Sequence, residues 1–136
     1  MVDILLQNPD GLTRPYGPYT QLTRVKNHSE LVFISGQLSV DSDGNIIGAD
    51  DFEAQCDQVY SNIGAALRGI GASYSNIVQF TTYLVDPEHI DLIYKWRNRE
   101  FPKLFLNSHY PANTLLVIQR LVDDAFLIEV QTIAAI

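Results

Sequence analysis

The clearest periodic pattern along the chain predicts an amphipathic helix between residues 50 and 71. Asp50 and Glu53 have the spacing of a capping box, in which two side chains satisfy free N–H groups at a helix start. Gly69 and Gly71 supply stop signals at the other end. Between them, apolar residues recur every three or four positions, as on one buried helix face: Phe52, Cys56, Val59, Ile63, Leu67 and Ile70.

A strand and a second helix are predicted next. Apolar and polar residues alternate over residues 77–85, which is typical of a strand with two different faces. Asp86 and Pro87 are then interpreted as the N-cap and first residue of a helix. Pro102 discourages continuation of that helix, because proline removes a backbone donor and clashes with the preceding turn.

Two β-hairpins are predicted at the ends of the chain. Residues 19–25 and 31–37 flank a short polar segment, and residues 115–121 and 125–136 flank Asp123 and Asp124. The order strand, strand, helix, strand, helix, strand, strand indicates an α+β fold. We expect one mixed sheet with both helices packed on one face.

The terminal strand carries a carboxylate in an unusual position. Glu129 lies within residues 126–136, which are otherwise mostly apolar and strand-forming. Burying an unpaired carboxylate is so unfavourable that a protein pairs it, raises its pKa, or keeps it beside a water-containing cavity. Glu129 is therefore a candidate proton acceptor. The strand face that carries Glu129 is too apolar to be left wet, which predicts contact with other copies of the chain.

Composition and charge narrow the class of protein. A chain of 136 residues with 46% hydrophobic content is expected to form a single domain over residues 1–136. A net charge of −7 disfavours nucleic acid as a partner. The apolar runs are shorter than the roughly 20 residues of a membrane span, and the first residues have no basic flank. We therefore expect a soluble, untargeted protein without a membrane partner, and the single Cys56 fits a cytoplasmic location.

Several residue types that often carry chemistry have ordinary interpretations here. The three histidines, His28, His89 and His109, are too far apart in sequence for a typical metal site and are assigned surface or capping roles. Cys56 is assigned to the core, and no glycine-rich phosphate loop is present. We therefore expect neither a metal nor a cofactor. The basic residues of the second helix are interpreted as a solvated face: Lys95, Arg97, Arg99 and Lys103.

Four short segments make the sequence similar to a known family. They are Gly-Pro-Tyr at 17–19, Phe-Ile-Ser-Gly-Gln at 33–37, Tyr-Pro-Ala-Asn-Thr at 110–114, and Ile-Glu-Val at 128–130. With these segments in this order and spacing, the chain resembles the Rid family (RidA/YjgF). Its members are reactive-intermediate deaminases that were earlier labelled translation-initiation inhibitors or L-PSP endoribonucleases. The resemblance runs from about Gly17 to the C-terminus. It implies a chorismate-mutase-like α+β fold and a homotrimer with three ligand clefts between subunits.

The resemblance also implies a reaction. In active family members the cleft hydrolyses enamines and imines, such as 2-iminoacids, to a ketoacid and ammonia without metal or cofactor. Glu129 matches a glutamate assigned to polarise the attacking water. Tyr19, Ser35 and Gly36 match residues that line the cleft. Thr114, in the third segment, is expected to contact the substrate as well.

The departure from the family pattern is Asn113. Family members that act on iminoacids carry at this position an arginine that binds the substrate carboxylate. Charged hydrogen bonds contribute about 1.5–3 kcal/mol against roughly 1 for neutral ones, so the exchange is expected to weaken iminoacid binding tenfold or more. Leu115 stands where several relatives carry a cysteine. Arg14 is a candidate replacement cation, whereas Arg120 matches an arginine that relatives also have.

These residues leave more than one function open. The first is an enzyme that hydrolyses a less charged enamine or imine, with Glu129 as base and Tyr19, Ser35 and Asn113 positioning the substrate. The alternative is a non-catalytic trimer that binds a metabolite or regulates. A third reading, an endoribonuclease, rests on the older family label and is disfavoured by the acidic charge and the lack of a catalytic histidine pair.

Overall fold

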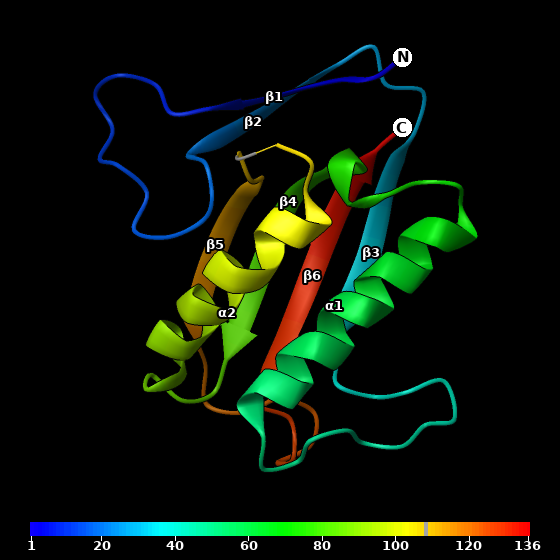
Figure 1. Ribbon diagram of the computed structural model, residues 1–136, viewed down its shortest axis with the longest axis vertical. Coiled ribbons are helices and arrows are strands. Elements are labelled where there is room, and N and C mark those ends of the chain that lie inside the picture. Colours follow the sequence, from blue (N-terminus) through cyan, green and yellow to red (C-terminus); the bar gives the residue numbers. More distant parts are fainter. Residues whose placement is uncertain (108) are drawn as a thin grey trace.

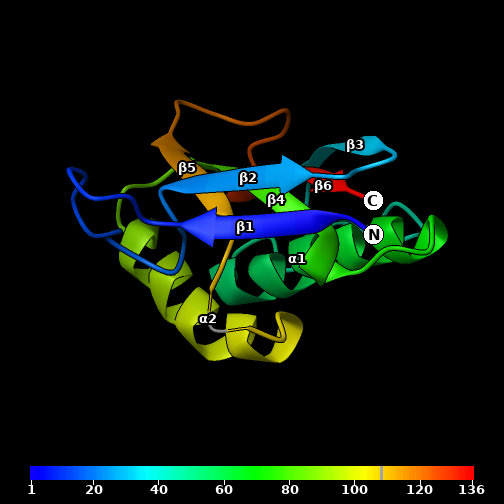
Figure 2. The ribbon, with the colours of Figure 1, turned by 90° about the horizontal axis from the view of Figure 1, so that it is seen from above.

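The computed structural model describes residues 1–107 and 109–136, in which two helices cover one face of a four-stranded sheet (Figure 1). The sheet has the order β3-β6-β4-β5, with β4 and β5 parallel and the other pairs antiparallel. A separate two-stranded sheet of β1 and β2 lies across the end of the larger sheet near the C-terminus (Figure 2). The elements are β1 (Asp3–Gln7), β2 (Leu22–Lys26), β3 (Leu31–Gln37), α1 (Phe52–Gly69), a 3-10 turn η1 (Tyr74–Asn76), β4 (Ile77–Leu84), α2 (His89–Leu104), β5 (Ala112–Val117) and β6 (Ile128–Ala135).

Helix α1 confirms the predicted apolar stripe from Phe52 to Leu67, whereas Ile70 follows the helix and is 48% exposed. The helix also begins with a different cap from the one predicted. The N-cap is Asp51, whose side chain accepts from the Ala54 backbone N–H at 3.0 Å. The capping box expected from Asp50 and Glu53 is therefore wrong. Glu53 has another partner, because its carboxylate pairs with Arg99 of α2 at 3.2 Å.

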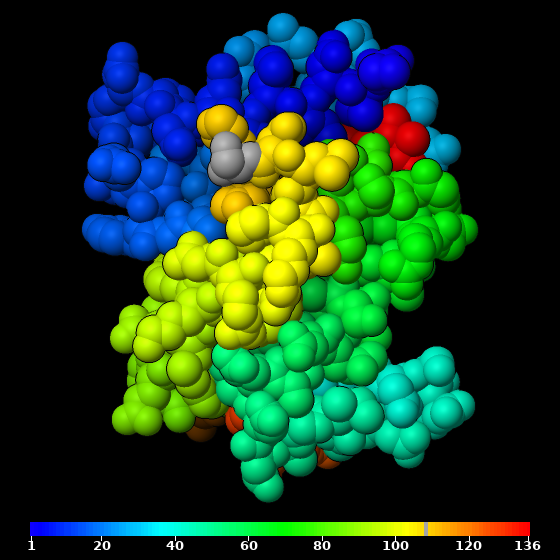
Figure 3. Space-filling view, viewed as in Figure 1, coloured from blue at the N-terminus to red at the C-terminus, as the bar shows by residue number. Residues whose placement is uncertain are grey.

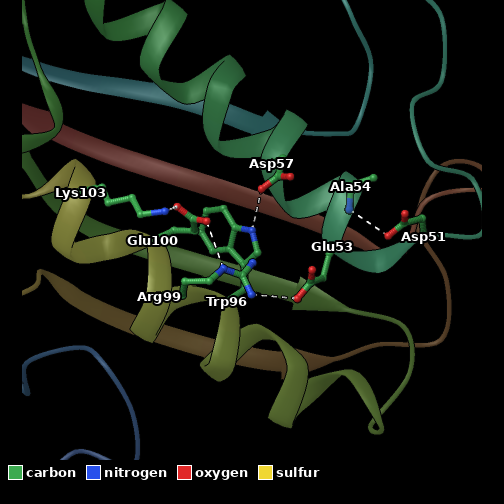
Figure 4. A network of polar contacts seen from close by, with 8 residues as sticks. All are labelled: Asp51, Glu53, Ala54, Asp57, Trp96, Arg99, Glu100 and Lys103. Atoms are coloured by element: carbon green, nitrogen blue, oxygen red, sulfur yellow. Dashed lines mark hydrogen bonds and ion pairs between the residues drawn. The ribbon is translucent and has the colours of Figure 1, made fainter.

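Polar contacts fix α2 against α1 (Figure 4). The Trp96 indole N–H donates to the Asp57 carboxylate at 2.8 Å, and Arg99 bridges Glu53 to Glu100. The Trp96 ring also stacks on Tyr60 of α1, with ring centroids 4.6 Å apart. The packing of α2 on α1 is thus fixed by a buried aromatic pair, a hydrogen bond and one exposed ion pair.

Helix α2 begins later and extends further than the sequence suggests. It starts at His89, because the Asp86 side chain accepts from the Glu88 N–H in a preceding turn. Pro102 lies inside the last turn and does not stop the helix. The turn still closes, since the Phe105 N–H donates to the Phe101 carbonyl at 2.9 Å.

Both predicted hairpins are wrong. Strand β2 pairs with β1, a strand that the sequence pattern did not indicate, and β3 pairs with β6. Strand β6 inserts between β3 and β4, so β5 and β6 are not neighbours. A turn signal reports only that the chain reverses, whereas these pairings join residues distant in sequence. The segment between β5 and β6 is consequently a long connection.

The two faces of the larger sheet differ as the terminal strand predicts. On the helix side, Ile128 and Val130 are fully buried, and the helices cover almost all of the sheet in the space-filling view (Figure 3). The opposite, open face exposes apolar side chains, among them Phe33 at 70% and Leu31 at 48%. Among the described residues, no helix is long and apolar enough to cross a bilayer.

Candidate functional site

Glu129 lies on the open face of the sheet, against the backbone of β3. The register between β3 and β6 shifts between Ile34 and Gln37, which brings Gly36 directly under the carboxylate. A Cβ atom at Gly36 would overlap Oε1 of Glu129 and stand only 2.7 Å from its Cδ. Only glycine therefore lets the acid occupy this position.

A cavity of about 520 Å³ opens beside this carboxylate, a size suited to a small organic ligand. The β5–β6 connection supplies one wall, and strands β3, β4 and β6 supply the floor. The segment between β5 and β6, which the sequence analysis predicted to be a hairpin turn, therefore lines the cavity. The lining residues are Ser35, Gly36, Tyr83, Ile118, Arg120, Leu121, Val122, Glu129 and Gln131.

A buried glutamine holds the β5–β6 connection in place. The Gln55 side chain, on α1, is fully buried and accepts from the Leu127 N–H at 2.8 Å. Its amide nitrogen donates to the carbonyls of Ala125 and Gly48, at 2.8 and 2.9 Å. The cavity wall is therefore anchored through the core to the first helix.

The electrostatic environment of Glu129 suits a role as proton acceptor. Desolvation by the surrounding protein raises the pKa of its carboxyl above the ordinary value. Within residues 1–107 and 109–136, its side chain has no hydrogen-bond or ion-pair partner. Arg120, also in the wall, is directed elsewhere: its Nε donates to the Leu121 carbonyl at 3.1 Å and pairs with Asp124 at 3.3 Å.

Asn113 lies on the other side of the sheet in the same protomer. It is paired with Phe80 in the parallel β4–β5 ladder, and Phe80 is buried under the helices. Glu129 is paired with Tyr83, which lines the open-face cavity. Thr114 is exposed and faces the same side as Glu129, but it does not line the cavity.

Tyr19 lies near the start of β5, away from Glu129. An isolated parallel bridge joins Thr20 to Ala112, which places Tyr19 and Asn113 on either side of one backbone contact. The Tyr19 hydroxyl accepts from the Tyr16 N–H at 3.1 Å. Tyr19 also lines a second hollow, formed by the N-terminal loop together with Arg14.

The structure adds Arg97, which the sequence analysis assigned to a solvated face. That assignment is wrong for this residue, because Arg97 is fully buried, whereas the side chain of Arg99 is 47% exposed. The Nε and Nη2 atoms of Arg97 donate to the Tyr60 hydroxyl at 3.1 and 2.9 Å, and Nη2 also donates to the Thr82 hydroxyl. The sequence does hold a signal, since Arg97 lies four residues from both Ile93 and Phe101 on the buried stripe.

Comparison with known proteins identifies the family to which this chain belongs. Residues 12–136 match the family described as Endoribonuclease L-PSP. A RutC family protein from Pyrococcus abyssi is 33% identical over 121 residues, which are 89% of this chain and 88% of that protein. The chain belongs to the Rid family.

Two further relatives bear on fold and activity. A Rid-family protein from Yersinia pestis, YyfB, has a TM-score of 0.82 at 22% identity, with 98% of each chain covered, and so supports the shared chorismate-mutase-like α+β fold. The human protein named 2-iminobutanoate/2-iminopropanoate deaminase is 25% identical, covering 87% of this chain and 80% of that protein. For this Rid-family chain, the residues matched by resemblance divide into two groups: Ser35, Gly36 and Glu129 on the open face, and Tyr19 and Asn113 at the β5 edge.

Proposed function

We propose that this Rid-family protein is a cytoplasmic homotrimer that hydrolyses a small reactive enamine or imine, with Glu129 as the general base. The observation that carries this proposal is a desolvated carboxylate without a partner among the described residues, held beside a cavity of about 520 Å³. The name of the human relative, an iminoacid deaminase, supports the same reaction class.

The proposed reaction needs one water molecule and one proton carrier. Glu129 takes a proton from water as the oxygen attacks the C=N carbon, and returns that proton to the nitrogen to give a neutral carbinolamine. The carboxylate then takes the carbinolamine hydroxyl proton and delivers it to the nitrogen as the C–N bond breaks, releasing ammonia and the carbonyl product. A raised pKa of Glu129 suits both steps, because a carboxyl group accepts and returns a proton most efficiently when its pKa approaches the pH of the solution.

The arrangement of the two residue groups supports a site shared between subunits. Asn113 and Glu129 face opposite sides of the sheet within one protomer, so a small substrate touches both only if they come from different chains. The exposed apolar side chains of the open face, such as Phe33, favour burial against a neighbour. The ligand cleft is therefore proposed to close on assembly, with Glu129, Ser35 and Gly36 of one subunit opposite Tyr19 and Asn113 of a neighbour.

Asn113 sets the expected substrate apart from ordinary 2-iminoacids. An amide offers no positive charge to a substrate carboxylate, whereas arginine offers a bidentate charged pair. Arg14 is exposed in the N-terminal loop near Tyr19. We therefore propose a less charged enamine or imine as the preferred substrate.

The test is hydrolysis of imines generated in solution by an amino-acid oxidase, with semicarbazide trapping what remains. Wild type is expected to release the carbonyl product faster than the uncatalysed reaction, and Glu129→Ala to lose this acceleration. Glu88→Gln, an exposed glutamate at the start of α2, is the matched control and should behave as wild type. Equal rates for wild type and Glu129→Ala, across acidic and neutral imines, would remove the enzymatic proposal.

A second candidate function is metabolite binding without turnover, favoured by Asn113. A ligand that binds only the folded protein raises its melting temperature, so a screen of neutral and acidic metabolites distinguishes the two functions. A large shift that survives Glu129→Ala, together with absent turnover, would favour the binding role. The endoribonuclease function rests on the family description alone, and the net charge of −7 opposes binding to RNA.

A further inference from the structure

Arg97 is a buried cation that lacks a counterion within residues 1–107 and 109–136. It is 0% exposed, and no carboxylate of these residues lies within 4.0 Å of it. In the same part of the chain, its buried Nη1 atom has no hydrogen-bond partner. The contacting Tyr60 does not neutralise the charge, because burial raises the pKa of its phenol and keeps it protonated. Buried charges are normally paired, so this arrangement calls for a physical explanation.

The hydrogen bonds around Arg97 have only one possible direction. A guanidinium donates and never accepts, so the Arg97 Nη2–H points at Thr82 Oγ1. The Thr82 hydroxyl must then give its own hydrogen to another acceptor, which is Asn113 Oδ1 at 2.8 Å. Asn113 Oδ1 also lies 3.5 Å from Arg97 Nη2. Rotating the amide by 180° would place its N–H groups against another donor.

We propose that Arg97 is a positioning residue that acts through Thr82 to hold Asn113 with its amide N–H groups turned outward. Asn113 is partly exposed on the edge strand β5, so these donors are available to a ligand. The subsite therefore selects hydrogen-bond acceptors, namely carbonyl or carboxylate oxygens, and rejects ammonium groups. The inference rests on the proposed function only in taking Asn113 as part of the ligand cleft.

The charge of Arg97 reinforces this selection. A chain of hydrogen bonds that starts at a cation polarises each following group, so the outward N–H groups of Asn113 become stronger donors. The same positive charge lies behind the amide in a region of low dielectric, which repels a cationic ligand group. The substrate class is thereby narrowed to enamines or imines that present an acceptor oxygen to Asn113.

The first test follows the side-chain amide signals of Asn113 by NMR in the full-length ¹⁵N-labelled protein. The signals are assigned by their loss in Asn113→Asp. Pyruvate and methyl pyruvate, a charged and a neutral acceptor, are expected to shift them, whereas methylammonium is not. In Arg97→Met the apparent affinity for pyruvate should fall at least tenfold. Arg99→Met removes an exposed charge from the same helix and should match wild type.

A second measurement covers the case in which Arg97→Met fails to fold. Asn113→Asp places a carboxylate next to Arg97 and gives the buried cation a counterion. This variant is expected to melt at or above the wild-type temperature, and pyruvate should not raise its melting temperature as it raises that of wild type. A melting temperature several degrees below wild type would overturn the inference. So would a pyruvate response that is the same in Arg97→Met and Arg99→Met.

Neither readout depends on turnover. A protein that shows no hydrolysis but an Arg97-dependent pyruvate response would refute the proposed function alone. Hydrolysis that requires Glu129 but shows no dependence on Arg97 would refute this inference alone.

Discussion

Glu129 lies on an apolar strand, against Gly36 of the neighbouring strand and at the edge of a cavity. Its position on the strand was visible in the sequence, because a lone acid among β-formers stands out. The close approach of Gly36 explains how the acid is kept on the sheet surface, since any larger residue would displace it. The two residues should therefore be treated as one unit when variants are designed.

The raised pKa of Glu129 predicts a pH-dependent stability difference. A carboxyl whose pKa is higher in the folded protein binds its proton more tightly there, so folding stability falls as pH rises above the ordinary glutamate value of about 4.3. Glu129→Gln removes this penalty. It should melt above wild type at neutral pH, and the difference should vanish as the pH approaches about 4.

Thermal unfolding between pH 4 and 8 measures this difference. Glu88→Gln, with its exposed carboxylate, serves as the control and should follow wild type throughout. A stabilisation by Glu129→Gln that is constant with pH, or that grows towards low pH, would show that desolvation of the charge is not its origin.

Helices and strands with a clear periodic pattern of apolar residues could be predicted from the sequence. The strands that pair with one another could not. The stripe from Phe52 to Leu67 and the alternation of β4 are contained in each segment, and both are confirmed. The insertion of β6 between β3 and β4 depends on contacts distant in sequence. The burial of Arg97 and Gln55 was missed for the same reason. Their hydrogen-bond partners lie on other elements, and the sequence pattern of one helix does not show them.

Gln55 should be essential for the wall of the cavity. Gln55→Ala leaves the Leu127 N–H and two carbonyls without their partner, and unpaired buried groups cost about 1–3 kcal/mol each. We expect the free energy of unfolding to fall by about 2–4 kcal/mol, since the structure relaxes in part. Chemical denaturation measures the loss. Gln119→Ala, an exposed glutamine of the same connection, should change it by less than about 0.5 kcal/mol, and an equally small effect of Gln55→Ala would contradict this role.

At the scale of the whole molecule, the open sheet face is expected to be covered by neighbouring chains. Phe33 is 70% exposed there, so Phe33→Asp should disturb the protomer little and assembly strongly. Light scattering should show the mass fall from that of a trimer to that of the 15.3 kDa chain. Leu92→Asp, on α2 over the opposite face, is the control and should remain trimeric. A monomeric wild type would contradict the expectation outright.

The most direct measurement mixes two variants. Glu129→Gln and Asn113→Asp are each expected to be folded and to lose hydrolysis, because each damages one side of every cleft. If the cleft lies between chains, reassembling the two variants together creates some clefts with an intact Glu129 from one protomer and an intact Asn113 from another. The account predicts that the mixture regains imine hydrolysis that neither parent shows. A mixture no more active than its parents, with mixed trimers verified by mass spectrometry, would contradict a shared site.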